Sequence, residues 1–310
     1  PYADITVLQK RAHLMFMRLK NPDLRYFETK NMGRTSTDPS LLVNGLPYKV
    51  ERSGGQVTVD KLRETSGGAL LENPINVRGR YAIHAHHCER FHLIGATAWA
   101  PVGGHPIPGW AITHHGGRGA IEDCVVSNGR GAGMVDELGN ERGQWVGNVV
   151  TGIRGDGDRA GWGSRSEHFS NHNGSVGIAY EFQSRALLVH GNIAGPSKYA
   201  FAWHAQKDNR WLRGLRGQDV RLLDGMMTGA AAVTEFWQDE TVGHFTPQIP
   251  PMLDNEVWAC RFGFSVIHRL AGSDALTRGD KTPMLMERFH CVNVPFAWEV
   301  PEYSNTYYVK

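Results

Sequence analysis

Histidine and acidic side chains recur at regular intervals in the middle of the chain, each shortly after an apolar residue. Three segments carry the pattern: 80–87 (RYAIHAHH), 110–115 (WAITHH) and 132–137 (AGMVDE). If each segment is a strand, its side chains alternate between two faces, and one face collects His86, His115 and Glu137. Two imidazoles and a carboxylate can donate and accept protons near neutral pH, as glycosidic or lyase cleavage requires.

The spacing of these residues predicts that the strands stack on one another. His115 follows His86 by 29 residues (115 − 86), and Glu137 follows His115 by 22 (137 − 115). Both intervals fall in the range of repeat lengths typical of solenoids. Because parallel neighbours lie about 4.8 Å apart, the side chains would form one outward column. The inward positions of the same strands are apolar: Ile83, Ile112 and Met134.

Neighbouring residues extend this candidate site. His84 shares a face with His86, and Asp136 lies beside Glu137, so we include both in the predicted catalytic set. Arg80 precedes the first of these strands and could bind a sugar carboxylate through two parallel hydrogen bonds.

The column is expected to continue past Glu137 as a substrate-binding surface. Glu181 follows after 44 residues (181 − 137), which fits two repeats of 22, and His204 follows Glu181 after 23 (204 − 181). Trp110 could stack on a sugar ring. We expect a surface or packing role for the other histidines of the region: His87, His92, His105 and His114.

A metal ion is a competing use of the same residues. His84, His86 and His115 would suit Zn²⁺ or another transition metal, because such ions accept imidazole ligands. Ca²⁺ prefers oxygen ligands, for which Asp156, Asp158, Asp136 and Glu141 are the candidates.

A second column, of residues at bends, supports the repeat. Cys124, Asn148 and Asn192 are separated by 24 (148 − 124) and 44 (192 − 148) residues, and the second interval again fits two repeats. A column of asparagines can bond the backbone of successive bends, because the amide both donates and accepts. We therefore predict a structural role for this column.

We expect residues 1–310 to form a single all-β domain. The 37 glycines are spread along the chain, which is typical of many regularly spaced turns. Residues 31–76 are rich in Gly, Ser, Thr, Pro and Asp and are expected to leave the stack as a long loop, with a hairpin over 48–51 and 56–59. The repeat weakens over 205–310, where strand-like segments nevertheless continue.

Charge and composition exclude several classes of protein. The 33 basic and 31 acidic residues are well mixed and give a net charge of +2, which argues against nucleic acid as a partner. No apolar run is long enough for a membrane span. The four cysteines show no CxxC spacing, so a zinc ribbon is not expected. No leader sequence opens the chain at Pro1, and we expect one, or an upstream domain, to lie outside it.

Four segments resemble a known family when they are taken together and in order: 11–17 (RAHLMFM), 31–35 (NMGRT), 79–86 (GRYAIHAH) and 133–141 (GMVDELGNE). They are similar to the β-helix region of the G8-domain proteins, the family of the cell-migration-inducing hyaluronidase. The likeness extends over residues 5–205. The run Gly-Arg-Tyr-(small)-Ile-His-x-His carries most of its specificity.

The resemblance implies a right-handed parallel β-helix in a secreted or cell-surface protein. It also implies action on an acidic, glycosaminoglycan-like polysaccharide, with dependence on calcium as in the animal members. By motif, the expected functional positions are Arg80, His84, His86 and the pair Asp136/Glu137. The chain departs from the family at Ala85, where phenylalanine is usual.

We therefore predict a polysaccharide-cleaving enzyme, a hydrolase in preference to a lyase, acting by acid–base chemistry. A second hypothesis is a non-catalytic carbohydrate-binding or structural β-helix of a surface layer or fibre, in which the polar column only packs. A third is a lyase or oxidase that depends on a metal bound by histidine. The sequence does not indicate the oligomeric state.

Overall fold

All elements of the described part of the chain are β-strands, so the all-β prediction is confirmed. The computed structural model describes residues 11–34, 42–43, 48–53, 56–61, 76–77, 79–137, 141–155, 177–182, 186–204, 252–267, 284–299 and 307–309. Within these ranges no helix has the length and apolar character that a membrane span requires.

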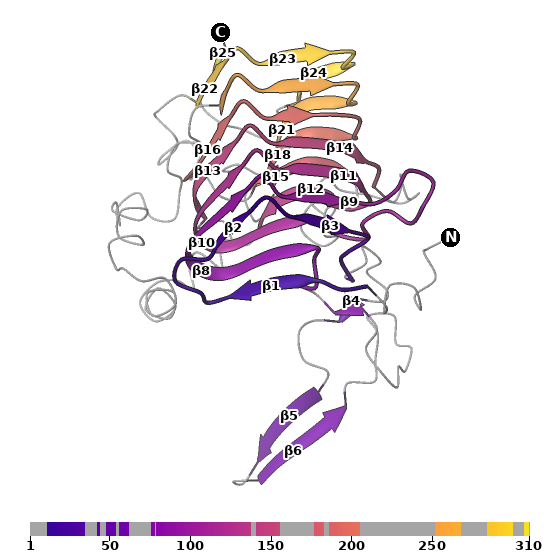
Figure 1. Ribbon diagram of the computed structural model, residues 1–310, viewed down its shortest axis with the longest axis vertical. Helices are drawn as coiled ribbons and strands as arrows, with labels where there is room; N and C mark the ends of the chain where they lie inside the picture. The colour runs from indigo at the N-terminus through magenta and orange to yellow at the C-terminus, as the bar shows by residue number, and fades with distance from the viewer. Residues whose placement is uncertain are drawn as a thin grey trace.

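Most of these strands form three ladders of parallel strands (Figure 1). The first ladder contains β1 (Leu14–Met17), the first halves of β8 (Ile83–Ile94) and β10 (Ile112–Glu122), β12 (Ala132–Asp136), β15 (Ile178–Phe182), β18 (Tyr199–His204), β21 (Phe262–Ile267) and β24 (Phe296–Glu299). The second contains β2 (Asp23–Arg25), the second halves of β8 and β10, β13 (Arg142–Val146), β16 (Ala186–His190), β19 (Met252–Leu253), β22 (Met284–Glu287) and β25 (Tyr307–Val309). The third contains β3 (Glu28–Lys30), β9 (Thr97–Trp99), β11 (Val125–Gly129), β14 (Val149–Ile153), β17 (Ile193–Ala194), β20 (Glu256–Trp258) and β23 (His290–Val292).

Along the chain, strands of the first, second and third ladders follow one another repeatedly in this order. We call one such set of strands a pass. The long strands β8 and β10 bend where they pass from the first ladder to the second. They thereby join the two ladders into one sheet of 14 strands. In later passes the same path is divided between two strands, such as β12 and β13. Strands from the C-terminal region extend all three ladders, so the stack continues to β25.

The hairpin predicted within residues 31–76 is present. Strands β5 (Tyr48–Ser53) and β6 (Gln56–Lys61) pair antiparallel. Strands β4 (Leu42–Val43) and β7 (Asn76–Val77) form a separate parallel pair. Figure 1 shows the hairpin lying apart from the stack.

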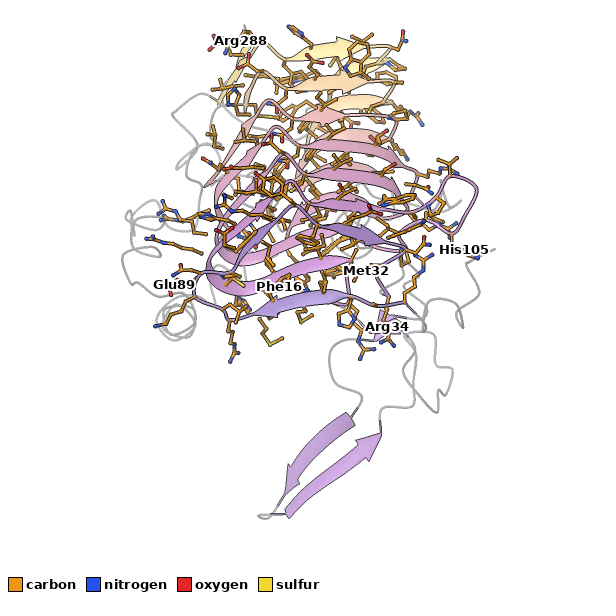
Figure 2. All side chains as sticks on the ribbon, viewed as in Figure 1. Phe16, Met32, Arg34, Glu89, His105 and Arg288 are labelled. Carbon is orange, nitrogen blue, oxygen red and sulfur yellow. The ribbon has the colours of Figure 1, made fainter. Side chains whose placement is uncertain are left out.

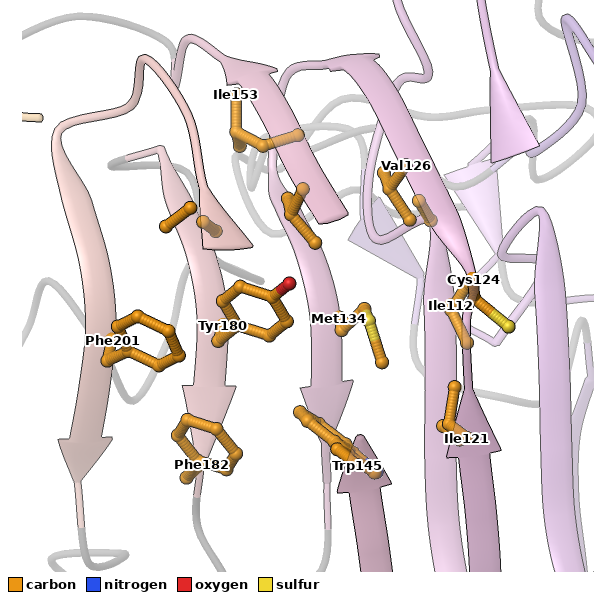
Figure 3. Close-up of a cluster of buried hydrophobic side chains, with 14 of the residues drawn as sticks. Ile112, Ile121, Cys124, Val126, Met134, Trp145, Ile153, Tyr180, Phe182 and Phe201 are labelled. Atoms are coloured by element: carbon orange, nitrogen blue, oxygen red, sulfur yellow. The ribbon is translucent and has the colours of Figure 1, made fainter. Parts of the chain in front are cut away.

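The register at the centre of the stack agrees with the predicted alternation. Ile112 pairs with Ile83 on one side and with Met134 on the other. All three side chains are buried in the core, which the inward positions of successive strands fill. Figure 3 shows this core, in which the rings of Tyr180 and Phe201 stack with centroids 4.7 Å apart. The side chains that face away from the core lie along the outside of the ladders (Figure 2).

The predicted column of bend residues runs along the start of the third ladder. The N–H of Cys124 donates to Oδ1 of Asn148, that of Asn148 to Asn192, and that of Asn192 to Asn255, each at 3.0 Å. The amide groups of the three asparagines donate in turn to carbonyls of the preceding strands. Because these groups are buried, the column satisfies backbone that water cannot reach.

One part of the repeat prediction was wrong. Residues Asn148 and Asn192 bond directly, so the 44 residues between them form one pass and not two. Likewise β12 pairs directly with β15, and β13 with β16. The length of a pass therefore varies along the chain, because the segments between strands differ in length while the strands keep their pairing.

Candidate active site

The first ladder brings His86, His115 and Glu137 into one file. His86 pairs with His115 across β8 and β10. The next strand, β12, keeps this register: His114 pairs with Asp136, and the N–H of Glu137 donates to the carbonyl of His114 at 3.0 Å. Glu137 thus follows directly on the end of β12, beside His115.

The side chains of this file are in contact. The rings of His86 and His115 stack with centroids 4.4 Å apart and planes inclined by 26°. Nδ1 of His115 lies 2.5 Å from a carboxylate oxygen of Glu137. The side chains of His115 and Glu137 are 16% and 21% exposed, so the pair is accessible to solvent although largely enclosed.

His84 joins the file from the same face of β8, as predicted. Its side chain is buried, and Nδ1 lies 2.7 Å from the carbonyl oxygen of Gly79. A carbonyl can only accept, so Nδ1 carries the proton and Nε2 presents a lone pair. That Nε2 lies 3.9 Å from the Glu137 carboxylate and has no hydrogen-bond partner.

His87 is the residue of the site that the sequence analysis missed. Its backbone has φ of 51°, and its ring lies 4.3 Å from that of His86 and 4.8 Å from that of His115. Strict alternation would have placed His87 on the opposite face, but the left-handed backbone at the bend of β8 turns its ring toward the same side. We refer to His84, His86, His87 and His115 as the histidine cluster.

The bend has a recognisable signal in the neighbouring strand. Gly116 and Gly117 of β10 have φ of 72° and 97° and run alongside His87 and Cys88. A Cβ on Gly117 would lie 1.8 Å from the carbonyl oxygen of Cys88, so the two strands approach too closely there for any side chain. Glu141, which is buried, accepts the N–H of Gly116 at 2.9 Å and holds the bend.

Burial and neighbouring charges shift the pKa values of the site residues in different directions. Burial lowers the pKa of His84 and of His86 to about 4, and that of His87 to about 3. Burial also acts to lower the pKa of His115, but attraction and hydrogen bonding to Glu137 outweigh it and raise that pKa. His115 in turn lowers the pKa of Glu137 against the effect of burial.

Three residues of the predicted set lie elsewhere. Asp136 pairs with His114 and is buried on the core side of β12, so it faces away from Glu137. Arg80 precedes β8 and lies beside Arg34: its backbone carbonyl accepts the N–H of Arg34 at 2.7 Å, and burial, together with the charge of Arg34, lowers the pKa of Arg80. Trp110 is 4% exposed and packs on the ring of Tyr81 at 4.6 Å, so it offers no open platform to a sugar.

The expected continuation of the column at Glu181 was wrong. Glu181 pairs with Val135, two residues before Glu137, and its side chain is fully buried. The backbone of His204 pairs with Ile267 in β21. The side chain of His204 and two of the candidate calcium ligands, Asp156 and Asp158, lie outside the described residues. The other two candidates, Asp136 and Glu141, are buried.

Within the described residues, the histidine cluster also contains the group best placed to hold a metal ion. One ligand nitrogen from each of His84, His86 and His115 lies within 4.8 Å of the others. No protein-family model, curated protein or solved structure matches the chain.

Proposed function

We propose that the chain is a right-handed parallel β-helix that binds and cleaves an acidic polysaccharide at the histidine cluster and Glu137. The fixed order in which the chain revisits three parallel ladders supports the fold. The observation that carries the activity is the contact of 2.5 Å between His115 and Glu137, placed beside a stacked second imidazole.

The His115–Glu137 pair supports proton transfer by its geometry. The carboxylate accepts the Nδ1–H and so fixes the orientation of the ring, which directs Nε2 away from Glu137. A carboxylate orients catalytic imidazoles in this way in other hydrolytic sites. His86, with its ring 4.4 Å away, supplies a second group able to exchange a proton with the same bond.

A positively charged side chain beside the histidine cluster supports the proposal that the substrate is acidic. Arg18 is exposed and directly follows β1, and its backbone N–H donates to the backbone carbonyl of His86 at 2.9 Å. Burial and the charge of His115 are the main causes that lower the pKa of His86; the charge of Arg18 acts in the same direction, whereas that of Glu137 raises the pKa. A guanidinium in this place can bind the carboxylate of a uronic acid. The family resemblance of the sequence points to the same substrate class and to a secreted or cell-surface location.

The structure favours this activity over a non-catalytic binding face. Trp110 is buried, and so is the outward row that runs through the first ladder: Thr113, Val135, Glu181, Ala202 and Ser265. An open carbohydrate-binding face would instead expose aromatic side chains along such a row.

A screen of uronic-acid polysaccharides tests the proposal. New reducing ends without ultraviolet absorbance would identify a hydrolase, and unsaturated products that absorb would identify a lyase. A protein that produces neither from any of the polymers, with metal supplied and with metal removed, would refute the proposed activity.

A further inference from the structure

We propose that His84, His86 and His115 bind one divalent transition-metal ion, with Zn²⁺ as the expected ion. The inference deepens the proposed function, because a metal ion would be the cofactor of the same site. Binding of the ion can be measured without a substrate, however, so each proposal can fail alone.

The distances suit an ion of this class. The three ligand nitrogens lie within 4.8 Å of one another. Around an ion with bonds of about 2.1 Å, tetrahedral ligands lie about 3.4 Å apart, so modest rotation of the rings would close the set. Three imidazoles favour Zn²⁺, Cu²⁺ or Ni²⁺ over Ca²⁺, which binds oxygen.

The outer hydrogen bonds of two of the rings match those of metal ligands. His84 donates Nδ1–H to the carbonyl of Gly79 at 2.7 Å, and His115 donates Nδ1–H to Glu137 at 2.5 Å. Histidines that bind metal ions commonly donate their second nitrogen to a carbonyl or carboxylate in this manner, which fixes the tautomer and directs the other lone pair to the ion. Glu137 also supplies negative charge next to a bound cation.

The cluster contains buried nitrogens that the protein leaves without partners. Nε2 of His84, Nδ1 of His86 and Nδ1 of His87 are enclosed and accept or donate no hydrogen bond. Burying a polar atom in this state costs free energy, and native structures do it rarely. An ion bound at the cluster gives the Nε2 lone pair of His84 a partner and accounts for the packing of imidazole on imidazole.

The proposed ion changes the assignment of chemistry within the site. Three protein ligands leave a fourth position open, and His87 borders the cluster from the bend of β8. A water molecule at that position would have its pKa lowered to about 7, as in zinc hydrolases, and could serve as the base or nucleophile. The lone pair of His115 would then hold the ion instead of exchanging a proton with the substrate.

Metal binding by the full chain provides the test. Protein stripped with chelator is titrated with Zn²⁺ by calorimetry, and Co²⁺ is added to read ligand geometry from its visible absorption. We expect one equivalent of Zn²⁺ to bind, with affinity reduced at least about 100-fold in His86→Ala and His115→Ala. Glu137→Gln should lower affinity by about 10- to 100-fold, as changes behind a ligand do.

The matched control is His92→Ala, which removes an exposed imidazole from the same strand, β8, and should bind like the wild type. Circular dichroism and melting of each variant show that it is folded. Wild-type protein that binds no stoichiometric metal, or cluster variants that bind it as tightly as His92→Ala, would overturn the site. Bound metal without polysaccharide cleavage would uphold the site while refuting the proposed function. Cleavage that survives complete removal of metal would uphold the proposed function and refute the role of the ion as its cofactor.

Discussion

The carboxylate of Glu137 lies 2.5 Å from Nδ1 of His115, although 22 residues separate them along the chain (137 − 115). The contact depends on the parallel pairing of β10 with β12, which places His114 opposite Asp136. The register of the strands therefore determines which side chains meet at the site. We expect substitutions at His115 or Glu137 to affect activity, and substitutions at the bends to affect stability.

Removing either imidazole of the stacked pair should abolish cleavage without unfolding the protein. We expect His86→Ala and His115→Ala to lower the rate of polysaccharide cleavage by at least about 100-fold, the usual contribution of a proton-transfer group. Both side chains lie on the outward face of the sheet, so melting temperatures should stay near that of the wild type. Unchanged activity in both variants, assayed for reducing ends, would contradict the assignment.

Replacing Glu137 with glutamine tests whether the charge of this side chain, and not only its size, is needed for activity. Glu137→Gln keeps the size of the side chain but removes the negative charge that orients and stabilises His115. We expect cleavage to fall by about 100-fold or more, because an imidazole in the wrong orientation or tautomer is a poor catalyst. Glu89→Gln, a partly exposed position in β8, is the control and should keep full activity.

At His87, the contribution of the imidazole ring to activity can be tested separately from the effect of the backbone conformation on stability. Because His87 has φ of 51°, glycine fits its backbone better than alanine does. We expect His87→Gly to be at least as stable as His87→Ala in denaturant unfolding, while both lose activity to a similar extent. Full activity in the glycine variant would show that the ring has no part in the chemistry.

Gly117 should be among the least replaceable residues of the bend. In Gly117→Ala, the new methyl group would meet the carbonyl of Cys88 at 1.8 Å, and we expect a loss of about 3 kcal/mol or more in the free energy of unfolding. Gly103→Ala is a matched control, because Gly103 also has positive φ (83°) but no atom within 4 Å of the added group. It should lose only about 1 kcal/mol, the cost of left-handed backbone. Equal losses in chemical denaturation would refute the steric argument.

The asparagine column should contribute strongly to stability. Asn192→Ala removes an acceptor for the N–H of Asn148 and a donor to the carbonyl of Trp145, both buried. We expect a loss of about 2–4 kcal/mol, since each unsatisfied buried group costs about 1–3 kcal/mol. Asn21→Ala, at an exposed position, should change the free energy of unfolding by less than about 0.5 kcal/mol.

Alternation and spacing were sufficient to predict the centre of the stack. Side chains in a strand alternate with a period of two, so the positions of Ile83, Ile112 and Met134 fixed which histidines would meet. The prediction succeeded because β8, β10 and β12 pair directly and in each segment the polar residue follows the apolar one by three positions.

Alternation failed at the bends, and spacing failed where bends differ in length. His87 was missed because its positive φ interrupts the alternation that the prediction assumed. Glu181 was misplaced because five residues separate β12 from β13, whereas three separate β15 from β16. The pass is therefore 44 residues long between Arg142 and Ala186 but 46 between Val135 and Glu181. Glu137 lies in the longer of the two bends, so it has no counterpart 44 residues later.

The unequal passes have a consequence for how such a protein could diversify. Between β12 and β15 the chain spends 46 residues (181 − 135), and between β15 and β18 only 21 (202 − 181), yet each strand meets its neighbour in parallel. The junctions between strands can thus differ greatly in length while the strands on either side stay paired in parallel. Related chains could therefore differ in the length and sequence of these junctions while the pairing of the strands on either side is kept.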